Sequence, residues 1–509
     1  MLSAAARPPT SSPLILDLIR WRSQQTPDAP ALFFAGRWYS YRALEQRANR
    51  LARRLYALGV RQGDRVGILA HNHLAHFDLL LAAPKLGYLH TAFNYRLSAT
   101  ELAPLLEQVQ ARCLFVDQAC HPLLDSPATP LLSLDGYEDW LSATSCESLP
   151  PPALTTDDGH LLLFTGGSTG LPKAAVLPYR QTLGNAWRTV EAWGLDAGDC
   201  ALQCTPCFHA AVNVLSLPLL ACGGRVVLLP EFDAADYLAQ VGRHRPSLLF
   251  MVPTMYQMLI DQPAFTGTDF SGVRWAISGG APCPPTVRAA FSASRVRFKQ
   301  GYGLTEAGVN CFGMDLDEAD HKPEFVGRPL PGLEAVVRGA DGRPLAPGEV
   351  GELTLRGEQV FSGYWQQPEE TAQALREGWL WTGDLAQVDA SGCFRIVGRR
   401  KEMYLSGGEN VYPSEVEAAL YRCPGVLDCA VLGLPDPLWG ESGLAAVVLQ
   451  AGQEADATAL RQTLRTQLAA YKLPRWFQFL PALPKTGAGK IDKNEIRRRY
   501  LQAQEALPR

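Results

Sequence analysis

The sequence lacks several features that would assign it to a specialised class of protein. Only 19% of its 509 residues are charged and the net charge is −4, so it has no basic excess of the kind that nucleic-acid-binding domains carry. No uncharged apolar run reaches the roughly 18 residues that a membrane-spanning helix needs. The longest candidate, 210–222, contains Asn213, Ser216 and Pro218 and is expected to be buried core. We therefore expect no nucleic-acid partner and no membrane span.

Cysteines are present, but not in a pattern that indicates disulfides or a structural metal. Twelve in a chain of this length do not make a disulfide framework, and only Cys204 and Cys207 form a Cys-x-x-Cys pair. Because a second pair at zinc spacing is missing, we interpret them as buried thiols in a reducing compartment, with a redox pair as the alternative.

The first residues do not fit the pattern of a secretory signal peptide. Residues 1–13 lack the apolar stretch of a secretory signal. We expect a frayed tail. A transit peptide is the alternative, because the segment before Asp17 contains one arginine and no acidic residue. We expect a cytoplasmic protein.

Short apolar runs alternate with longer segments that suit helices. Four runs, at 161–165, 225–229, 247–252 and 274–278, are typical of buried strands. The sequence therefore predicts an α/β fold of layered subdomains with largely parallel sheets. Between 326 and 398 the runs shorten and Asp-Gly, Pro-Gly and Ser-Gly pairs separate them, which predicts a small antiparallel sheet or β-barrel-like subdomain.

The pattern changes again after Arg399. Ser414 and Glu417 fit a capping box at a helix start, a strand-like run follows at 428–434, and leucines 460, 464 and 468 lie on one face of a helix predicted over 457–471. The predicted organisation is an α/β N-terminal domain over 1–398 that includes the small β subdomain, a hinge at 399–402, and a small α+β C-terminal domain over 403–509.

The strongest local signal is the stretch TGGSTGLPK from Thr165 to Lys173, directly after a predicted strand. All six residues from 165 to 170 are Thr, Ser or Gly. Glycines let backbone N–H groups approach an anion and hydroxyls add donors, while the lysine can place a cation on a phosphate. The stretch is not the P-loop pattern G-x-x-x-x-G-K-[ST]. That pattern has a second glycine five residues after the first, directly before the lysine, whereas here Leu171 stands five residues after Gly166 and Pro172 precedes Lys173. It predicts a phosphate-binding loop, with a flexible surface loop as the alternative.

Four weaker motifs follow: QGYGLTE at 300–306, TGD at 382–384, GRRKE at 398–402 leading to SGGEN at 406–410, and PKTGAGKI at 484–491. Tyr302 can stack on a base and Glu306 can hold a divalent cation against phosphates. Asp384 can accept hydrogen bonds from a ribose diol, and Lys490 can bring a cation to charge that develops in a transition state. Each has an ordinary alternative: a structural turn, an Asx turn, a solvated basic linker or a C-terminal tail.

Taken together and in this order, the motifs resemble those of the adenylate-forming superfamily, which contains acyl-CoA synthetases, aryl-CoA ligases, firefly luciferase and peptide-synthetase adenylation domains. The resemblance covers about 14–499. The similarity is closest to the acyl-CoA and aryl-CoA ligases, through YGLTE (302–306), GYW (363–365), REGWLWTGD (376–384), SGGENVYPSEVE (406–417), PDPLWGE (435–441) and YKLP (471–474). It implies a reaction in two steps. A carboxylate attacks the α-phosphate of Mg·ATP, giving acyl-adenylate and pyrophosphate, and a thiol, usually that of coenzyme A, then displaces AMP.

The resemblance also implies roles for individual residues in the first step. Lys490 would bridge the substrate carboxylate and the α-phosphate, and Thr165 and Glu306 would help position Mg²⁺. The residues implied to bind ATP or AMP are Thr165, Gly166, Gly167, Ser168, Thr169, Gly170, Lys173, Gly279, Gly280, Ala281, Tyr302, Gly303, Thr305, Asp384 and Arg399. Within this set, 165–173 would hold the β- and γ-phosphates, Tyr302 and 279–281 would flank the adenine, and Asp384 and Arg399 would hold the ribose.

For the second step, Lys401 falls at the position of the family's hinge, which holds Asp or Lys. The small domain would rotate there after adenylation, withdraw Lys490 and present 407–409 to a pantetheine tunnel. The residues implied to contact coenzyme A are Gly407, Gly408, Glu409, Trp439, Lys472 and Arg475.

His209 matches the family's aromatic position beside the substrate carboxylate, with a core histidine as the alternative. Three positions depart from the common pattern: 210–212 are Ala-Ala-Val where a glycine is frequent, Gly167 replaces the commonest Ser, and Ala174 replaces the commonest Gly. None of these departures removes a charge. The residues expected to line the acid pocket are His209, Val212, Asn213, Gly280, Gly303 and Val309.

The segments around that pocket contain one charged residue, Glu306, already assigned to the metal. Burying a second substrate carboxylate without a cation is costly, so we expect an uncharged acid tail and disfavour dicarboxylates and amino acids. A medium- or long-chain fatty acid is the first expectation, and a benzoate- or cinnamate-like acid the second.

The predicted partners are a small carboxylic acid, ATP and coenzyme A, in either a monomer or a homodimer. One alternative is a stand-alone ligase that loads the phosphopantetheine of an acyl carrier protein. Another is a catalytically inactive nucleotide-binding relative, against which the presence of Lys490, Glu306, Asp384 and Arg399 argues.

Overall fold

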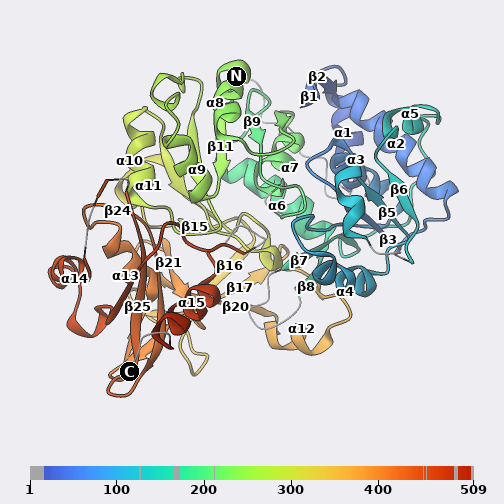
Figure 1. Cartoon of the computed structure of the whole chain (residues 1–509). Helices are drawn as coiled ribbons and strands as arrows, with labels where there is room; N and C mark the ends of the chain where they lie inside the picture. Colours follow the sequence, from blue (N-terminus) through green and yellow to red (C-terminus); the bar gives the residue numbers. More distant parts are fainter. Residues whose placement is uncertain are drawn as a thin grey trace. The chain divides into compact units, whose positions relative to one another are not determined.

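A computed structural model describes residues 16–124, 128–165, 172–210, 212–450, 452–453, 456–486 and 491–505. The chain divides into two compact units, which are described separately (Figure 1). The first comprises Met1–Ala281, Phe291–Ala335 and Leu355–Trp381. The second comprises Pro282–Ala290, Val336–Thr354 and Thr382–Arg509.

One seven-stranded sheet of the first unit has the order β13-β12-β11-β9-β10-β1-β2. Its strands are β1 (Pro30–Phe34), β2 (Arg37–Ser40), β9 (Cys200–Gln203), β10 (Arg225–Leu228), β11 (Leu248–Met251), β12 (Trp275–Ser278) and β13 (Phe298–Gln300). All neighbours pair in parallel except β1 and β2. Every residue of β9, β11 and β12 is buried, as expected of parallel strands covered on both faces.

The second seven-stranded sheet has the order β18-β8-β7-β4-β3-β5-β6. Its strands are β3 (Arg65–Leu69), β4 (Leu89–Ala92), β5 (Cys113–Val116), β6 (Leu131–Ser133), β7 (Gly159–Thr165), β8 (Lys173–Pro178) and β18 (Gly363–Tyr364). Pairing is parallel from β6 to β7. β8 turns back antiparallel to β7, and β18 pairs antiparallel to β8. A small separate pair is made by β14 (Phe312–Gly313) and β15 (Arg328–Pro329).

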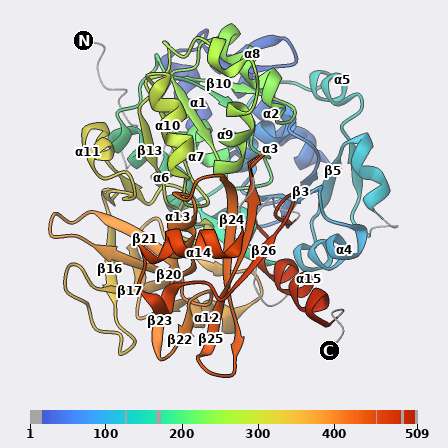
Figure 2. The same ribbon diagram turned by 60° about the vertical axis from the view of Figure 1, so that its left-hand side comes forward.

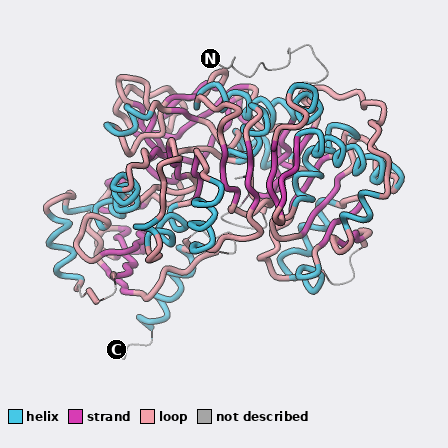
Figure 3. Tube along the Cα trace, turned by 90° about the horizontal axis from the view of Figure 1, so that it is seen from above, coloured by secondary structure: helices cyan, strands magenta, loops and turns pink. Residues whose placement is uncertain are grey.

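Helices flank these strands (Figure 3). They are α1 (Leu18–Gln25), α2 (Tyr41–Ala57), α3 (Leu74–Leu86), α4 (Ala99–Val109), α5 (Tyr137–Ser142), α6 (Tyr179–Trp193), α7 (Val212–Cys222), α8 (Ala234–His244), α9 (Pro253–Ile260), α11 (Leu316–His321) and α12 (Pro368–Ala374), with 3₁₀ turns η2 (Gln118–Leu123), η3 (Phe265–Gly267) and η4 (Thr305–Ala307). α10 (Pro285–Ala293) begins in the second unit and ends in the first. No described helix of the chain is both long and apolar enough to cross a membrane. The layered α/β fold is confirmed, and the four predicted strands correspond to β7, β10, β11 and β12.

The region predicted to form a small β subdomain contains a five-stranded sheet of order β16-β17-β20-β19, with β21 paired to β20. The strands are β16 (Leu333–Arg338), β17 (Val350–Gly357), β19 (Leu375–Arg376), β20 (Trp379–Val388) and β21 (Phe394–Arg399). β20 pairs antiparallel with both β19 and β21. The division into units passes through this sheet, so the predicted boundary at 398 stays a prediction.

The C-terminal part of the second unit is a mixed sheet of order β23-β22-β25-β24, with β26 parallel to β25. Its elements are β22 (Tyr404–Ser406), β23 (Glu409–Val411), α13 (Pro413–Leu420), β24 (Val426–Asp436), β25 (Gly440–Leu449), α14 (Ala457–Arg465), η5 (Ala470–Lys472), β26 (Trp476–Phe479) and α15 (Lys493–Glu505) (Figure 2). Leu460 and Leu464 of α14 pack into one core with Val416 and Leu420 of α13. The predicted α+β character of this part is confirmed.

Two local predictions in this part are wrong. The helix predicted over 457–471 ends at Arg465, because the Thr466 hydroxyl bonds back to the Thr463 carbonyl and the backbone of Ala469 is extended. The capping box is not formed. α13 begins at Pro413 with Tyr412 as its N-cap, two residues too early for the box, and the Ser414 hydroxyl donates instead to the Val397 carbonyl.

All twelve cysteines lie in described residues and none forms a disulfide. Cys204 and Cys207 are buried, and burial raises the pKa of both thiols. A raised pKa disfavours the reactive thiolate. These observations support the interpretation of both residues as buried thiols rather than a redox pair.

Candidate active site

The hairpin between β7 and β8 places two of the predicted phosphate-binding residues opposite each other. Thr165 ends β7, Lys173 begins β8, and the two residues pair in the antiparallel register. The Thr165 hydroxyl donates to the Lys173 carbonyl oxygen at 3.4 Å. Residues 166–171 between them, which include the predicted Gly166, Gly167, Ser168, Thr169 and Gly170, lie outside the described residues.

Tyr364 connects this hairpin to the predicted metal-binding carboxylate. Tyr364 lies on β18, which pairs with β8. The Lys173 ammonium lies 5.1 Å from the centroid of the Tyr364 ring, a cation–π distance. The Tyr364 hydroxyl donates to Glu306 Oε1 at 2.9 Å. The structure thus brings Lys173 and Glu306 to the same tyrosine. The sequence did not predict Tyr364 as a site residue. The signal that could have identified it is the Gly-Tyr-Trp segment, which carried only the family resemblance.

The donor set here fits Mg²⁺. Thr165 offers a hydroxyl and Glu306 a carboxylate, and Mg²⁺ prefers oxygen ligands of this kind. Glu306 is half-buried, and Tyr364 is the only hydrogen-bond partner of its side chain among the described residues. One carboxylate oxygen therefore remains available for a ligand.

The residues predicted to flank the adenine follow the ends of neighbouring parallel strands. β12 ends at Ser278 and is followed by Gly279, Gly280 and Ala281, while β13 ends at Gln300, just before Tyr302. The two strands pair in parallel, so their carboxyl ends meet at one edge of the sheet, where open α/β sheets bind ligands. Gly280 adopts φ +83°, in the left-handed region.

The loop that begins with Tyr302 folds back tightly on itself. A Cβ at Gly303 would lie 2.0 Å from the Val309 carbonyl oxygen, so only glycine fits there. The Tyr302 ring packs edge-on against Phe312 with centroids 5.8 Å apart, and the Thr305 carbonyl accepts from Gln181 Nε2 at 2.7 Å. Gly303 and Val309, both predicted for the acid pocket, are therefore held against each other.

In the second unit, Asp384 and Arg399 occupy paired positions on β20 and β21. Arg399 Nε donates to Asp384 Oδ1 at 2.6 Å, and the carboxylate side chain is 6% exposed against 46% for the guanidinium. The strand pairing thus brings together the two residues predicted to hold the ribose. The pairing with Arg399 also distinguishes Asp384 from a simple Asx-turn residue.

Four of the residues predicted to contact coenzyme A, Gly407, Gly408, Glu409 and Trp439, lie at or beside one hairpin. Gly407 and Gly408 form the turn between β22 and β23 with φ of +60° and +86°, and exposed Glu409 begins β23. The Gly407 N–H donates to the Trp439 carbonyl at 2.9 Å, and a Cβ at Gly407 would lie 2.8 Å from the Trp439 ring. The indole is half exposed.

Asp436 organises the neighbouring residues of that set. Its carboxylate accepts from the Trp439 N–H at 3.2 Å and pairs with Arg475 at 2.6 Å. Hydrogen bonds from the Ser442 hydroxyl and from nearby backbone N–H groups lower the pKa of Asp436 to about 2. A different carboxylate holds Lys472, whose Nζ lies 2.6 Å from Glu415 Oε1.

Lys490 lies outside the described residues, and Lys401 is exposed after β21. Lys493, at the start of α15, lies 2.9 Å from Glu402 and 3.0 Å from Glu417. The helix that follows Lys490 is therefore tied by ion pairs to the predicted hinge segment at Glu402, an anchor that the sequence interpretation did not include.

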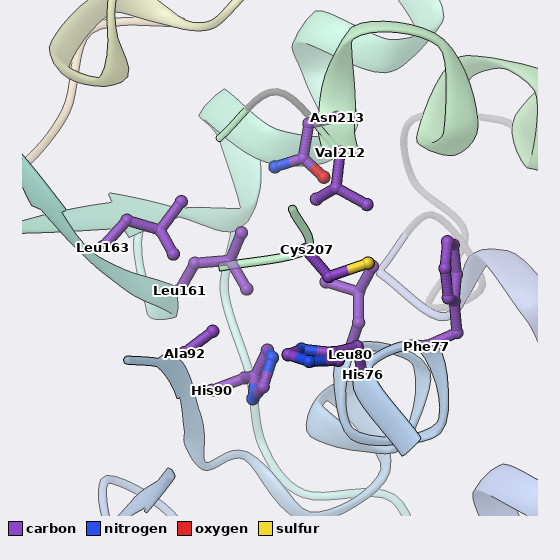
Figure 4. A pocket seen from close by; sticks show the side chains of 10 residues that line it. All are labelled: His76, Phe77, Leu80, His90, Ala92, Leu161, Leu163, Cys207, Val212 and Asn213. Carbon is purple, nitrogen blue, oxygen red and sulfur yellow. The ribbon is translucent and has the colours of Figure 1, made fainter. Parts of the chain in front are cut away.

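The predicted acid-pocket residues Val212 and Asn213, at the start of α7, line a pocket in the first unit (Figure 4). Its other lining residues are His76, Phe77 and Leu80 of α3, His90 and Ala92 of β4, Leu161 and Leu163 of β7, and Cys207. His209 lies two residues beyond Cys207, half-buried, with its ring 4.4 Å from that of Phe208.

Sequence reasoning missed His76 and His90, because neither belongs to a motif that marks a site. Burial lowers the pKa of His76 to about 4 and that of His90 to about 3. Both rings are therefore neutral at physiological pH, and the pocket contains no charged side chain. The cavity volume accessible to water is about 20 Å³, enough for one water or a group of that size.

The chain matches known proteins over nearly its whole length. Residues 19–365 match the family described as AMP-binding enzyme, and residues 415–490 match the AMP-binding enzyme C-terminal domain. A feruloyl-CoA synthase from Amycolatopsis sp is 39% identical, over 94% of this chain and 97% of that protein. A fatty acid–[acyl-carrier-protein] ligase, ScoC from Streptomyces coeruleorubidus, is 33% identical over 94% and 95%.

Among solved structures, ATP-bound MatB from Rhodopseudomonas palustris superimposes with a TM-score of 0.89 at 30% identity, covering 95% of this chain and 99% of that one. These matches confirm the predicted fold, the reaction class and the cofactors ATP, Mg²⁺ and coenzyme A. The chain belongs to the AMP-binding enzyme family, a family of AMP-forming acid–thiol ligases.

Proposed function

We propose that the protein is an acyl-CoA ligase for an aromatic carboxylic acid of the cinnamate type. The observation that carries this proposal is the uncharged, largely apolar pocket that Val212 and Asn213 line with two neutral histidines (Figure 4). The sequence favoured a fatty acid first and an aryl acid second. We reverse this order, because the feruloyl-CoA synthase is 39% identical and the fatty acid ligase 33%.

In the first step of the proposed reaction, a carboxylate oxygen of the acid bonds to the α-phosphorus of ATP and pyrophosphate leaves. Lys173 and the loop before it bind the β- and γ-phosphates, Tyr302 flanks the adenine, and Asp384 with Arg399 holds the ribose. Thr165 and Glu306 would hold Mg²⁺, which would neutralise phosphate charge. Lys490 holds the attacking carboxylate and the α-phosphate together and stabilises the charge that develops there.

In the second step the thiol sulfur of coenzyme A bonds to the acyl carbon and AMP leaves. Trp439 offers an exposed aromatic face, and the cations of Lys472 and Arg475 are held near the same hairpin by carboxylates. An aromatic face with cations suits the nucleotide of coenzyme A. A carrier protein is the second candidate acceptor, because ScoC acts on one.

The predicted substrate range is tested by measuring pyrophosphate release with 4-hydroxycinnamate, cinnamate, benzoate, octanoate, palmitate and succinate, each with and without coenzyme A. We expect kcat/KM for the cinnamates to exceed that for the fatty acids by about tenfold or more, because a rigid aromatic acid loses less conformational entropy on binding than a flexible chain. Succinate should be inactive, since no cation in the pocket faces its second carboxylate.

A preference for palmitate or octanoate would contradict the proposed acid and restore the fatty acid. The acceptor is compared in parallel with a phosphopantetheinylated carrier protein at matched concentration. Faster acylation of the carrier than of coenzyme A would establish the second candidate instead.

A further inference from the structure

The two histidines of the pocket each keep one ring nitrogen without a partner. His76 is 4% exposed and His90 is 5% exposed, and neither Nδ1 atom has a hydrogen-bond partner within the described part of the chain. Figure 4 shows the two rings together at one end of the pocket, with Asn213 at the other. A buried polar atom left unsatisfied costs free energy, so a ligand or water is expected to fill this end.

The backbone fixes which hydrogen-bonding group His76 presents. Its Nε2 lies 3.2 Å from the His71 carbonyl oxygen and 3.4 Å from that of Ala70. Carbonyl oxygens only accept, so Nε2 carries the single proton of the neutral ring. The Nδ1 atom is therefore a bare lone pair, and only a donor satisfies it.

A third buried histidine shows the contrast. His160 is 2% exposed but does not line the pocket. Its Nδ1 lies 2.7 Å from the Thr182 hydroxyl and its Nε2 lies 3.3 Å from the Leu80 carbonyl. The fold thus satisfies both nitrogens of this buried histidine, whereas each of the two rings that line the pocket keeps one unpartnered nitrogen.

The chemistry of this end selects a small, neutral donor. The lining contains no charged side chain to offset an ionic ligand, and a methoxy or halogen substituent has no hydrogen to give. A hydroxyl donates one hydrogen bond and is about the size of the one water for which there is space. Cys207 and Asn213, which also line the pocket, flank His209 in the sequence.

We propose that His76 and His90 form a subsite for a hydroxyl group on the ring of the acid, with His76 Nδ1 accepting its hydrogen bond. The substrate class is then hydroxyaryl acids rather than aryl acids in general. This inference rests on the proposed aromatic substrate, and it adds two specificity-determining residues to that function.

The test compares 4-hydroxycinnamate with 4-fluorocinnamate, which is similar in size but cannot donate, and with cinnamate. A site built to hydrogen-bond a substrate hydroxyl rejects analogues that lack it, so the wild-type enzyme should prefer the hydroxy acid by about 10²-fold in kcat/KM. His76→Phe should reduce this preference to about threefold or less while retaining activity on 4-fluorocinnamate. His90→Leu is a second variant in case His76→Phe does not fold.

Leu163→Met is the matched control, because Leu163 lines the same pocket without a polar atom. It should change kcat/KM for all three acids alike. Equal wild-type activity on all three acids would leave the aromatic function standing but overturn the subsite, and would assign the end of the pocket to a water alone. A preference that survives both histidine variants would also overturn it. If only fatty acids react, the proposed function fails first and the subsite with it.

Discussion

Lys490→Ala should slow adenylate formation by about 10²–10³-fold, the usual effect of removing one group that stabilises transition-state charge. The same variant should convert preformed acyl-adenylate and coenzyme A to thioester at a rate within about twofold of wild type, because the lysine acts in the first step only. The two rates are measured separately: pyrophosphate release without coenzyme A, and thioester formation from synthetic acyl-adenylate.

Lys485→Ala is the control for this prediction. Lys485 belongs to the same segment, 484–491, so its loss tests whether any nearby positive charge suffices. Its adenylation rate should remain close to that of wild type. Equal loss of both half-reactions in the Lys490 variant would refute the assignment of this lysine to the first step.

Glu306→Gln should lower the rate of adenylation by about 10²-fold and raise the Mg²⁺ concentration needed for half-maximal rate, because a metal-ligating charge is lost. A glutamine oxygen can still accept from the Tyr364 hydroxyl, so the hydrogen bond seen at 2.9 Å is kept. The measurement is the rate of pyrophosphate release at saturating acid and ATP across a Mg²⁺ titration.

Tyr364→Phe separates the charge from its positioning. This variant removes the hydrogen bond to Glu306 while keeping the aromatic ring near Lys173, so we expect a loss of about tenfold or less, equivalent to a single hydrogen bond to a charged group. If the two variants showed equal losses and the same Mg²⁺ dependence, Glu306 would have a structural role rather than a metal-binding one.

The sequence predicted the fold best where its patterns are local. Buried parallel strands read as short apolar runs, and the four predicted ones lie within a residue or two of β7, β10, β11 and β12. Helix ends were less predictable, because they depend on tertiary contacts. The hydroxyl of Ser414 caps nothing in its own helix, since it donates its hydrogen bond to the carbonyl of Val397, which lies 17 residues earlier in the sequence.

The same distinction holds for the site. Residues predicted through motifs, such as Asp384 with Arg399 and Gly407 with Trp439, prove to be paired by strand register and turn geometry. His76 and His90 could not be predicted, because a pocket wall is assembled from α3, β4, β7 and α7, and no local pattern marks which buried histidine lacks a partner. The sequence marked Tyr364 as part of a family motif but did not predict its role. Its contacts with Lys173 and Glu306 depend on the pairing of β18 with β8.

The most direct test of the account is to mix the enzyme with Mg·ATP and 4-hydroxycinnamate in the absence of coenzyme A and to analyse the quenched mixture by mass spectrometry. The account predicts hydroxycinnamoyl-adenylate at about one equivalent per enzyme, with matching pyrophosphate, and its conversion to thioester and AMP when coenzyme A is added. Formation of ADP and inorganic phosphate, or the absence of any adenylate until coenzyme A is present, would contradict it.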